Sequence, residues 1–99
     1  MKIEYKNSKI ERVCTNAYEA ERKYGKEMAE KIWLRIDQMK AAFSVEMMIK
    51  FKLGRCHSLK GKRKNQYAVD LVHPFRLVFE KKGNEVQIVN IIEIVDYHK

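Results

Sequence analysis

The sequence contains little that would tie the chain to a membrane or to an oxidising compartment. Its 99 residues include two cysteines, Cys14 and Cys56, which are too few for a disulfide framework. No apolar run approaches the ~18–20 residues needed to span a bilayer, and no signal-peptide pattern follows Met1. We therefore expect a reduced, cytoplasmic protein that makes no membrane contact.

Proline and glycine are also scarce, at one and four residues, and no linker, repeat or low-complexity segment divides the chain. An apolar content of 45% with ten aromatic residues is typical of a folded domain, because disordered chains are poor in both. A chain of this length can bury one modest core but not two. We expect a single domain over residues 1–99.

Acidic residues are missing from residues 50 to 64, which we call the basic stretch. The chain has a net charge of +8, and outside the basic stretch 14 basic residues nearly balance 13 acidic ones. Such a concentration of positive charge indicates a loop that faces the phosphates of RNA, although a solvated basic face is the alternative. The cations concerned are Lys50, Lys52, Arg55, Lys60, Lys62, Arg63 and Lys64.

Helical periodicity covers the first half of the chain. Ser8 and Glu11 form a capping-box signature, and apolar residues then recur on one face until Gly25 ends the helix. A second helix is predicted over residues 26–43, with Trp33 on its buried stripe. The two helices would form a hairpin with a very short turn.

After residue 64 the apolar period changes to two, which is typical of strands. Residues 67–72 and 75–80 alternate as two strands, and the apolar run 86–95 predicts a strand covered on both faces. Residues 1–6 supply a fourth candidate, whereas residues 44–51 fit either a helical turn or an irregular segment. The predicted fold is α+β, an N-terminal two-helix hairpin packed on a three- to four-stranded, mainly antiparallel sheet.

Several side chains have the chemistry needed to cleave RNA without a metal. That reaction needs a base for the 2′-hydroxyl proton, an acid for the departing 5′-oxygen and cations for the charge that builds on phosphorus. His57 and His98 suit the proton transfers, and Asp96 suits a base or a residue that orients a histidine. Arg76 and Lys60 suit the phosphate, while Tyr97 suits stacking on a base or donation of its hydroxyl.

Two other interpretations remain open for these side chains. Arg76 lies in an apolar strand, where an ordinary ion pair with Asp70, Glu80 or Glu93 would also explain it. A metal site is the competing chemistry, but the cysteines and histidines show no paired ligand spacing. We expect neither a metal nor another cofactor.

Four segments in the second half of the chain together resemble the RelE/ParE superfamily of toxins, and most closely its HigB-like branch. They are residues 55–63 (RCHSLKGKR), 66–69, 73–80 and the closing DYH at 96–98. The resemblance is specific over about residues 53–99 and general over the helices. Ser58 departs from the pattern, since many relatives carry proline there.

The resemblance implies a compact fold of two helices on an antiparallel sheet and cleavage of mRNA in the ribosomal A site. It also implies neutralisation by a cognate antitoxin, commonly a helix-turn-helix protein. The positions that correspond to catalytic residues of HigB-like toxins are His57, Arg76, Asp96, Tyr97 and His98.

The sequence therefore predicts a ribosome-dependent, metal-independent mRNA endoribonuclease, the toxin of a type II toxin–antitoxin system. The basic stretch would contact the message and ribosomal RNA. Two alternatives belong to other classes: a non-enzymatic inhibitor of DNA gyrase like ParE, and a basic RNA-binding module that does not cleave.

Overall fold

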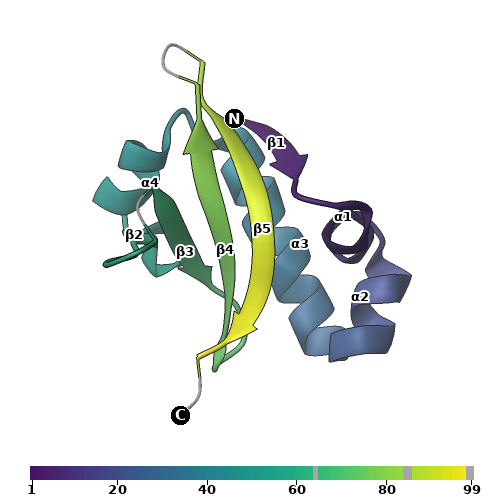
Figure 1. Cartoon of the computed structure of the whole chain (residues 1–99). Helices are drawn as coiled ribbons and strands as arrows, with labels where there is room; N and C mark the ends of the chain where they lie inside the picture. Colours follow the sequence, from purple (N-terminus) through teal and green to yellow (C-terminus); the bar gives the residue numbers. More distant parts are fainter. Residues whose placement is uncertain (64, 84–85, 98–99) are drawn as a thin grey trace.

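The computed structural model of the chain describes residues 1–63, 65–83 and 86–97, and it has an α+β architecture (Figure 1). A helical layer, in which α3 is the longest element, packs against a curved sheet. The elements in chain order are β1 (Lys2–Tyr5), α1 (Ser8–Thr15), α2 (Ala17–Tyr24), α3 (Lys26–Ala41), α4 (Val45–Lys50), the 3₁₀ turn η1 (Leu53–Arg55), β2 (His57–Ser58), β3 (Gln66–Asp70), β4 (Phe75–Lys82) and β5 (Ile88–Asp96).

The sheet has five strands within the described residues, in the order β1-β5-β4-β3-β2. Its strand pairs are antiparallel except for β1, which runs parallel to β5 at one edge. The prediction of three to four strands is thus corrected to five, and the sheet is mixed. At two residues, β2 is too short to show a period in the sequence. The parallel partner of β1 lies more than eighty positions away, so no local pattern indicates it.

Asparagine side chains set the beginnings of the first two helices. Asn7 Oδ1 accepts a hydrogen bond from the backbone N–H of Ile10 at 2.9 Å, so Asn7, not Ser8, caps α1. Asn16 ends α1 and caps α2, because its Oδ1 accepts from the N–H of Glu19 at 3.2 Å. The single helix predicted up to Gly25 is therefore two helices. Within the described residues no helix is long and apolar enough to cross a membrane.

The core lies between the sheet and the helices, and α3 contributes one narrow stripe to it. That stripe consists of Met28, Ile32, Ile36 and Met39, each at most 5% exposed. Trp33 is 66% exposed, so its predicted burial is wrong. One residue beyond Ile32, it is rotated about 100° around the helix axis and lies outside the stripe.

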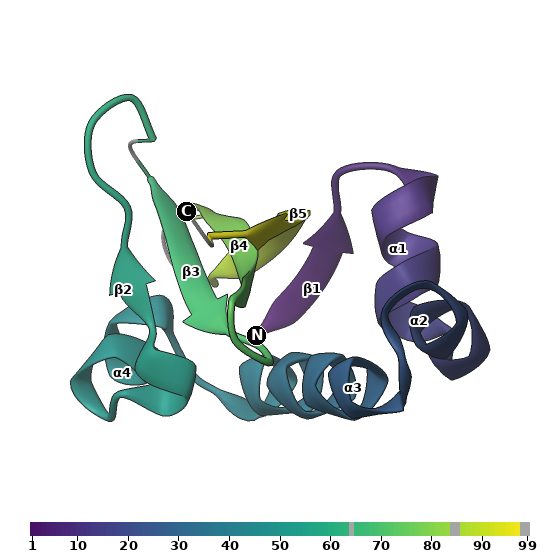
Figure 2. The ribbon, with the colours of Figure 1, turned by 90° about the horizontal axis from the view of Figure 1, so that it is seen from below.

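The sheet face turned away from the helices is called the open face below; it carries Ala68, Asp70, Arg76 and Val78. Figure 2 shows α3 lying along one side of the sheet and the loop between β2 and β3 extending away from the helices. The basic stretch contributes Lys60, Lys62 and Arg63 to this loop, and Arg63 contacts Glu93 at the open face.

A β-bulge in β5 changes which residues reach the open face. Val78 pairs with Glu93, whereas the next residue, Phe79, pairs with Ile91, so Ile92 is the extra residue. Before the bulge, Ile91 faces the helices with buried Phe79; after it, Glu93 lies opposite Val78 on the open face. The change of phase explains why this strand reads as a nearly continuous apolar run.

The ambiguous segment after α3 is a helix, α4, which Ser44 caps by accepting from the N–H of Met47 at 3.0 Å. Glu46 fastens α4 to the sheet, because its carboxylate accepts from Lys81 Nζ at 2.7 Å and from Gln87 Nε2 at 2.6 Å. Gln87 Oε1 in turn accepts from the N–H of Val45. These contacts fix the helix that leads into η1 and the basic stretch.

Two hydrogen bonds lower the pKa of the Glu46 carboxyl from 4.5 to about 2, and the one from Lys81 has a larger effect than the one from Gln87. A carboxyl whose pKa is lower in the folded state stabilises the fold at pH values above the pKa of the unfolded state. That stabilisation is lost as the pH falls through the pKa of the folded state. Glu46→Gln should therefore be less stable than wild type at neutral pH, by a difference that shrinks as the pH falls from 4.5 to about 2. Urea unfolding at a series of pH values measures this difference. Glu27→Gln, on the exposed side of α3, should follow the wild-type pH profile; a constant difference for Glu46→Gln would contradict the prediction.

Candidate functional site

A row of side chains crosses the open face from β2 to β5. The register places His57 opposite Ala68, Ala68 opposite Val78, and Val78 opposite Glu93. Ala68 and Val78 are fully buried although they lie on the side away from the helices. The row thus has a floor of two small apolar side chains between a histidine and a carboxylate.

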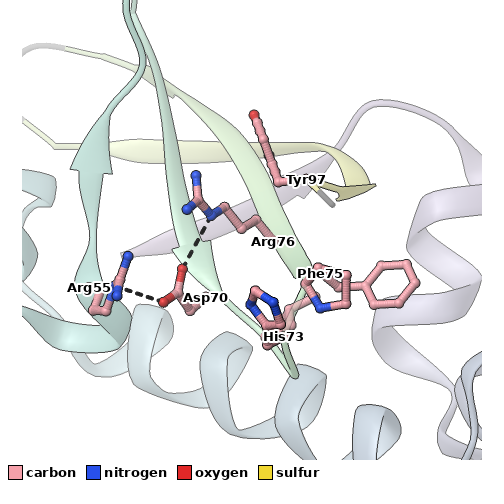
Figure 3. Close-up of a pocket in the computed structure, with 8 residues that line it drawn as sticks. Arg55, Asp70, His73, Phe75, Arg76 and Tyr97 are labelled. Carbon is pink, nitrogen blue, oxygen red and sulfur yellow. Dashed lines mark ion pairs between the residues drawn. The ribbon is translucent and has the colours of Figure 1, made fainter. Parts of the chain in front are cut away.

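A pocket of about 200 Å³ lies next to this row, where β3 ends, β4 begins and the chain leaves β5 (Figure 3). Residues from η1, β3 and β4, from the turn between β3 and β4, and from the position after β5 meet there. Its lining is Arg55, Asp70, Leu71, His73, Pro74, Phe75, Arg76 and Tyr97.

Asp70 joins two arginines at the pocket. Its Oδ2 is 2.9 Å from Arg55 Nε, and its Oδ1 is 3.4 Å from Arg76 Nε. Oδ1 is buried and has no hydrogen-bond partner among the described residues, so Arg76 meets it as an ion pair with poor hydrogen-bond geometry. The backbone oxygen of Asp70 accepts from Arg35 Nε at 2.7 Å. Among the described residues, two arginines thus face one carboxylate at the pocket, and the net charge there is positive.

Arg76 and Tyr97 are in contact on the open face. The Cζ atom of Arg76 lies 4.6 Å from the centre of the Tyr97 ring, a cation–π contact. The backbone N–H of Tyr97 donates to Pro74 O at 3.0 Å, which fastens this residue to the start of β4. Figure 3 shows the Arg76 side chain between Asp70 and Tyr97. The guanidinium is therefore held from two sides, by a carboxylate and by a ring.

His57 is half-buried at the β2 end of the row, and its Nδ1 is 2.9 Å from the backbone oxygen of Arg55. Because a carbonyl oxygen can only accept, this contact requires a proton on Nδ1. In the neutral ring Nε2 then carries the lone pair. His57 thus has the tautomer of a base that takes protons at Nε2.

The cations of the basic stretch divide into two groups. Lys50, Lys52, Lys60 and Lys62 are exposed. Arg63 is half-buried and pairs with Glu93, with Arg63 Nη2 2.8 Å from Glu93 Oε1. Arg55, whose side chain is 74% exposed, reaches back to Asp70. Lys64 lies outside the described residues.

The turn that carries Arg55 depends on left-handed backbone. Lys52, Gly54 and Arg55 have φ values of 54°, 58° and 53°. Gly54 also packs against Arg35 of α3, where an added Cβ would lie 2.8 Å from Arg35 Nε. A side chain at Gly54 would displace the arginine that supports the end of β3.

One of the predicted catalytic residues, Asp96, is assigned to the other side of the sheet. Asp96 pairs with Phe75, whose ring packs against Tyr24 of α2 with centroids 5.6 Å apart. The register therefore assigns Asp96 to the helix-covered side, opposite from Arg76. His98 lies outside the described residues. His57, Arg76 and Tyr97 are the predicted residues that the structure assigns to the open face.

The sequence indicated Asp70 only as an alternative partner for Arg76, and His73 only as one of the scattered residues weighed for a metal site. The signal for Asp70 was the short turn between the two predicted strands, which makes residues at equal distances from it face each other. Asp70 and Arg76 are such a pair. In the described part of the chain, no group of three or more His, Cys, Asp or Glu side chains is placed to hold a metal ion.

Comparison with known proteins gives one kind of match. No family model matches the sequence, and no curated protein matches it either. The structure is similar to that of a "YoeB/ParE toxin from Agrobacterium tumefaciens", with a TM-score of 0.67 and 22% sequence identity. The similarity covers 99% of this chain and 100% of the other. It establishes that this protein has the same fold as that toxin.

The bridge that Asp70 makes between Arg55 and Arg76 should contribute to stability. Asp70→Asn keeps the shape of the side chain but removes the charge that holds two guanidinium groups close together. We expect a loss of about 1 kcal/mol in the free energy of unfolding, discounted because the carboxylate is partly exposed. Urea denaturation at neutral pH measures it, with Asp37→Asn on the exposed side of α3 as the matched control. Equal stabilities of the two variants would contradict the bridge.

Proposed function

We propose that this protein is the toxin of a type II toxin–antitoxin system, of the HigB-like branch, and that it cleaves mRNA on the ribosome without a metal. The observation that carries the proposal is the grouping of His57, Arg76 and Tyr97 on one face of a toxin-like sheet. Exposed Lys60 and Lys62 belong to the loop between β2 and β3, which extends away from the helices. The sequence segments that resemble HigB-like toxins contain the same three residues.

The reaction needs few groups. Nε2 of His57 takes the proton of the 2′-hydroxyl, and the 2′-oxygen then attacks the adjacent phosphorus while the bond to the 5′-oxygen breaks. The products are a 2′,3′-cyclic phosphate and, once the leaving oxygen has gained a proton, a 5′-hydroxyl. The guanidinium of Arg76 stabilises the negative charge that builds on the phosphoryl oxygens.

The remaining roles are assigned by chemistry. Tyr97 offers a ring on which an unstacked base can lie. His98 is the proposed acid for the 5′-oxygen, on the strength of the sequence resemblance alone. Asp96, whose pairing with Phe75 turns it to the other side, has no part in the proposed proton transfers.

The small size of the pocket is the reason to propose that the enzyme depends on the ribosome. The pocket beside Arg76 has a volume of about 200 Å³, too small to enclose several nucleotides. Phosphate contacts from lysines give affinity without selecting a sequence. We infer that the ribosome presents the message and that a cognate antitoxin, of the helix-turn-helix class, restrains the free toxin in the cytoplasm.

Inhibition of DNA gyrase in the manner of ParE is the second candidate. It would act through protein contacts, for which exposed apolar side chains such as Trp33 and Phe51, 66% and 67% exposed, are suited. A surface that binds only protein has no need of a histidine poised as a base. This difference separates the two candidates by mutation.

On ribosomes programmed with a defined mRNA, His57→Ala and Arg76→Ala should each lower the cleavage rate by about 100-fold or more, since each loses a proton-transfer or charge-stabilising group. Primer extension measures the cleaved fraction with time. Arg12→Ala, an exposed arginine of α1, is the matched control and should cleave at the wild-type rate.

Naked mRNA should be cleaved weakly or not at all by the wild-type protein, and its vigorous digestion would contradict the role of the ribosome. Growth arrest by the wild type and by both variants, with the mRNA intact, would instead favour a protein target such as gyrase.

A further inference from the structure

Arg63 is one of the cations expected to bind RNA, yet its guanidinium is occupied within the protein. Nη2 donates to Glu93 Oε1 at 2.8 Å, Nε donates to Gln66 Oε1 at 3.0 Å, and Nη1 donates to the Tyr97 hydroxyl at 3.4 Å. All three of its nitrogen atoms thus have acceptors in the chain. The hydrogen bond with Glu93 raises the pKa of Arg63.

The two arginines of the open face hold Tyr97 between them. Arg76 lies over its ring, with Cζ 4.6 Å from the ring centre, and Arg63 reaches its hydroxyl from the β2–β3 loop. Tyr97 follows the last residue of β5, so no strand pairing fixes its side chain. Contacts at both the ring and the hydroxyl leave few orientations for it.

Glu93 is available to Arg63 because of the bulge at Ile92. With an uninterrupted alternation, Glu93 would share the side of Ile91, which is fully buried against the helices. The bulge turns Glu93 outward, opposite Val78, where its carboxylate meets a loop arginine. The bulge thus determines that the side chains of both Glu93 and Tyr97 lie on the open face.

We propose that Glu93 and Arg63 are positioning residues that hold Tyr97 against the substrate, and that Arg63 does not bind RNA phosphate. This inference rests on the proposed RNA cleavage. A guanidinium whose charge is balanced by a carboxylate 2.8 Å away adds little to the attraction of a phosphate. In the same loop, the exposed Lys60 and Lys62 are the cations that contact phosphate.

The experiment compares Glu93→Gln, Arg63→Gln and Lys62→Ala on programmed ribosomes. It measures the cleavage rate at saturating ribosome concentration and the dependence of binding on salt. Both Glu93→Gln and Arg63→Gln should lower the saturating rate by about 10- to 100-fold, because a misplaced Tyr97 no longer meets the substrate. They should leave the salt slope unchanged, whereas Lys62→Ala should reduce it by about one.

Two further variants separate a positioning role from a general loss of structure. Arg63→Lys keeps the positive charge but cannot reach three acceptors, so it should lose rate nearly as much as Arg63→Gln. In a Tyr97→Phe background, Arg63→Gln should cause little further loss, because its effect acts through the hydroxyl of Tyr97. Arg12→Gln and Glu27→Gln, both exposed on helices, are the matched controls with wild-type behaviour.

The opposite results would overturn the inference. If Arg63 binds phosphate, Glu93→Gln frees it and tightens ribosome binding, Arg63→Gln reduces the salt slope by about one, and Arg63→Lys keeps most of the activity. An active wild type with these results leaves the proposed function intact and removes only the positioning role. An inactive wild type overturns both.

Discussion

The bulge at Ile92 is the constraint on which the arrangement of this protein depends. A strand alternates strictly, so a residue that faces the core fixes the direction of every later residue. Here Val89 and Ile91 must be buried, and they are fully so. Without an inserted residue, Glu93 would share their side of the sheet. Because of the bulge, β5 places Val89 and Ile91 in the core and Glu93 on the open face.

Charge balance is the second constraint, and the bulge contributes to it through Glu93. Arginines placed close together on a sheet repel one another, and each loses hydration where it is partly covered. Asp70 compensates Arg76 and Arg55, and Glu93 compensates Arg63. The carboxylates lie on β3 and β5, on either side of the strand that carries Arg76. For the RNA cleavage that we propose, cations would thereby be held in place before the phosphate arrives, which is the arrangement that electrostatic catalysis requires.

The fold class and the strands β1, β3, β4 and β5 followed from the sequence because their signals are local. Period-two alternation in β3 and β4, with a turn between them, correctly indicated that Arg76 faces away from Phe75 and Leu77. Features that depend on distant partners were not predictable. The bulge arises from a competition between the core and the open face, and β1 pairs with a strand from the other end of the chain.

The candidate site was recognisable only in part for the same reason. His57, Arg76 and Tyr97 stood out by chemistry and by resemblance, but nothing local showed that Arg63 would fold back on Glu93, 30 residues away. Asp96 shows the reverse case. It was grouped with Tyr97 and His98 by its carboxylate chemistry and by the resemblance, whereas its pairing with Phe75 assigns it to the side of the sheet opposite Arg76.

The chemistry of the RNA ends tests the central claim most directly. If a 2′-oxygen attacks the phosphorus, mRNA cleaved by the wild-type protein on ribosomes must carry a 2′,3′-cyclic phosphate on the upstream fragment and a 5′-hydroxyl on the downstream one. The downstream fragment should then accept labelled phosphate from polynucleotide kinase without prior phosphatase treatment. Fragments that carry a 5′-phosphate, or growth arrest with no new RNA ends, would contradict the account.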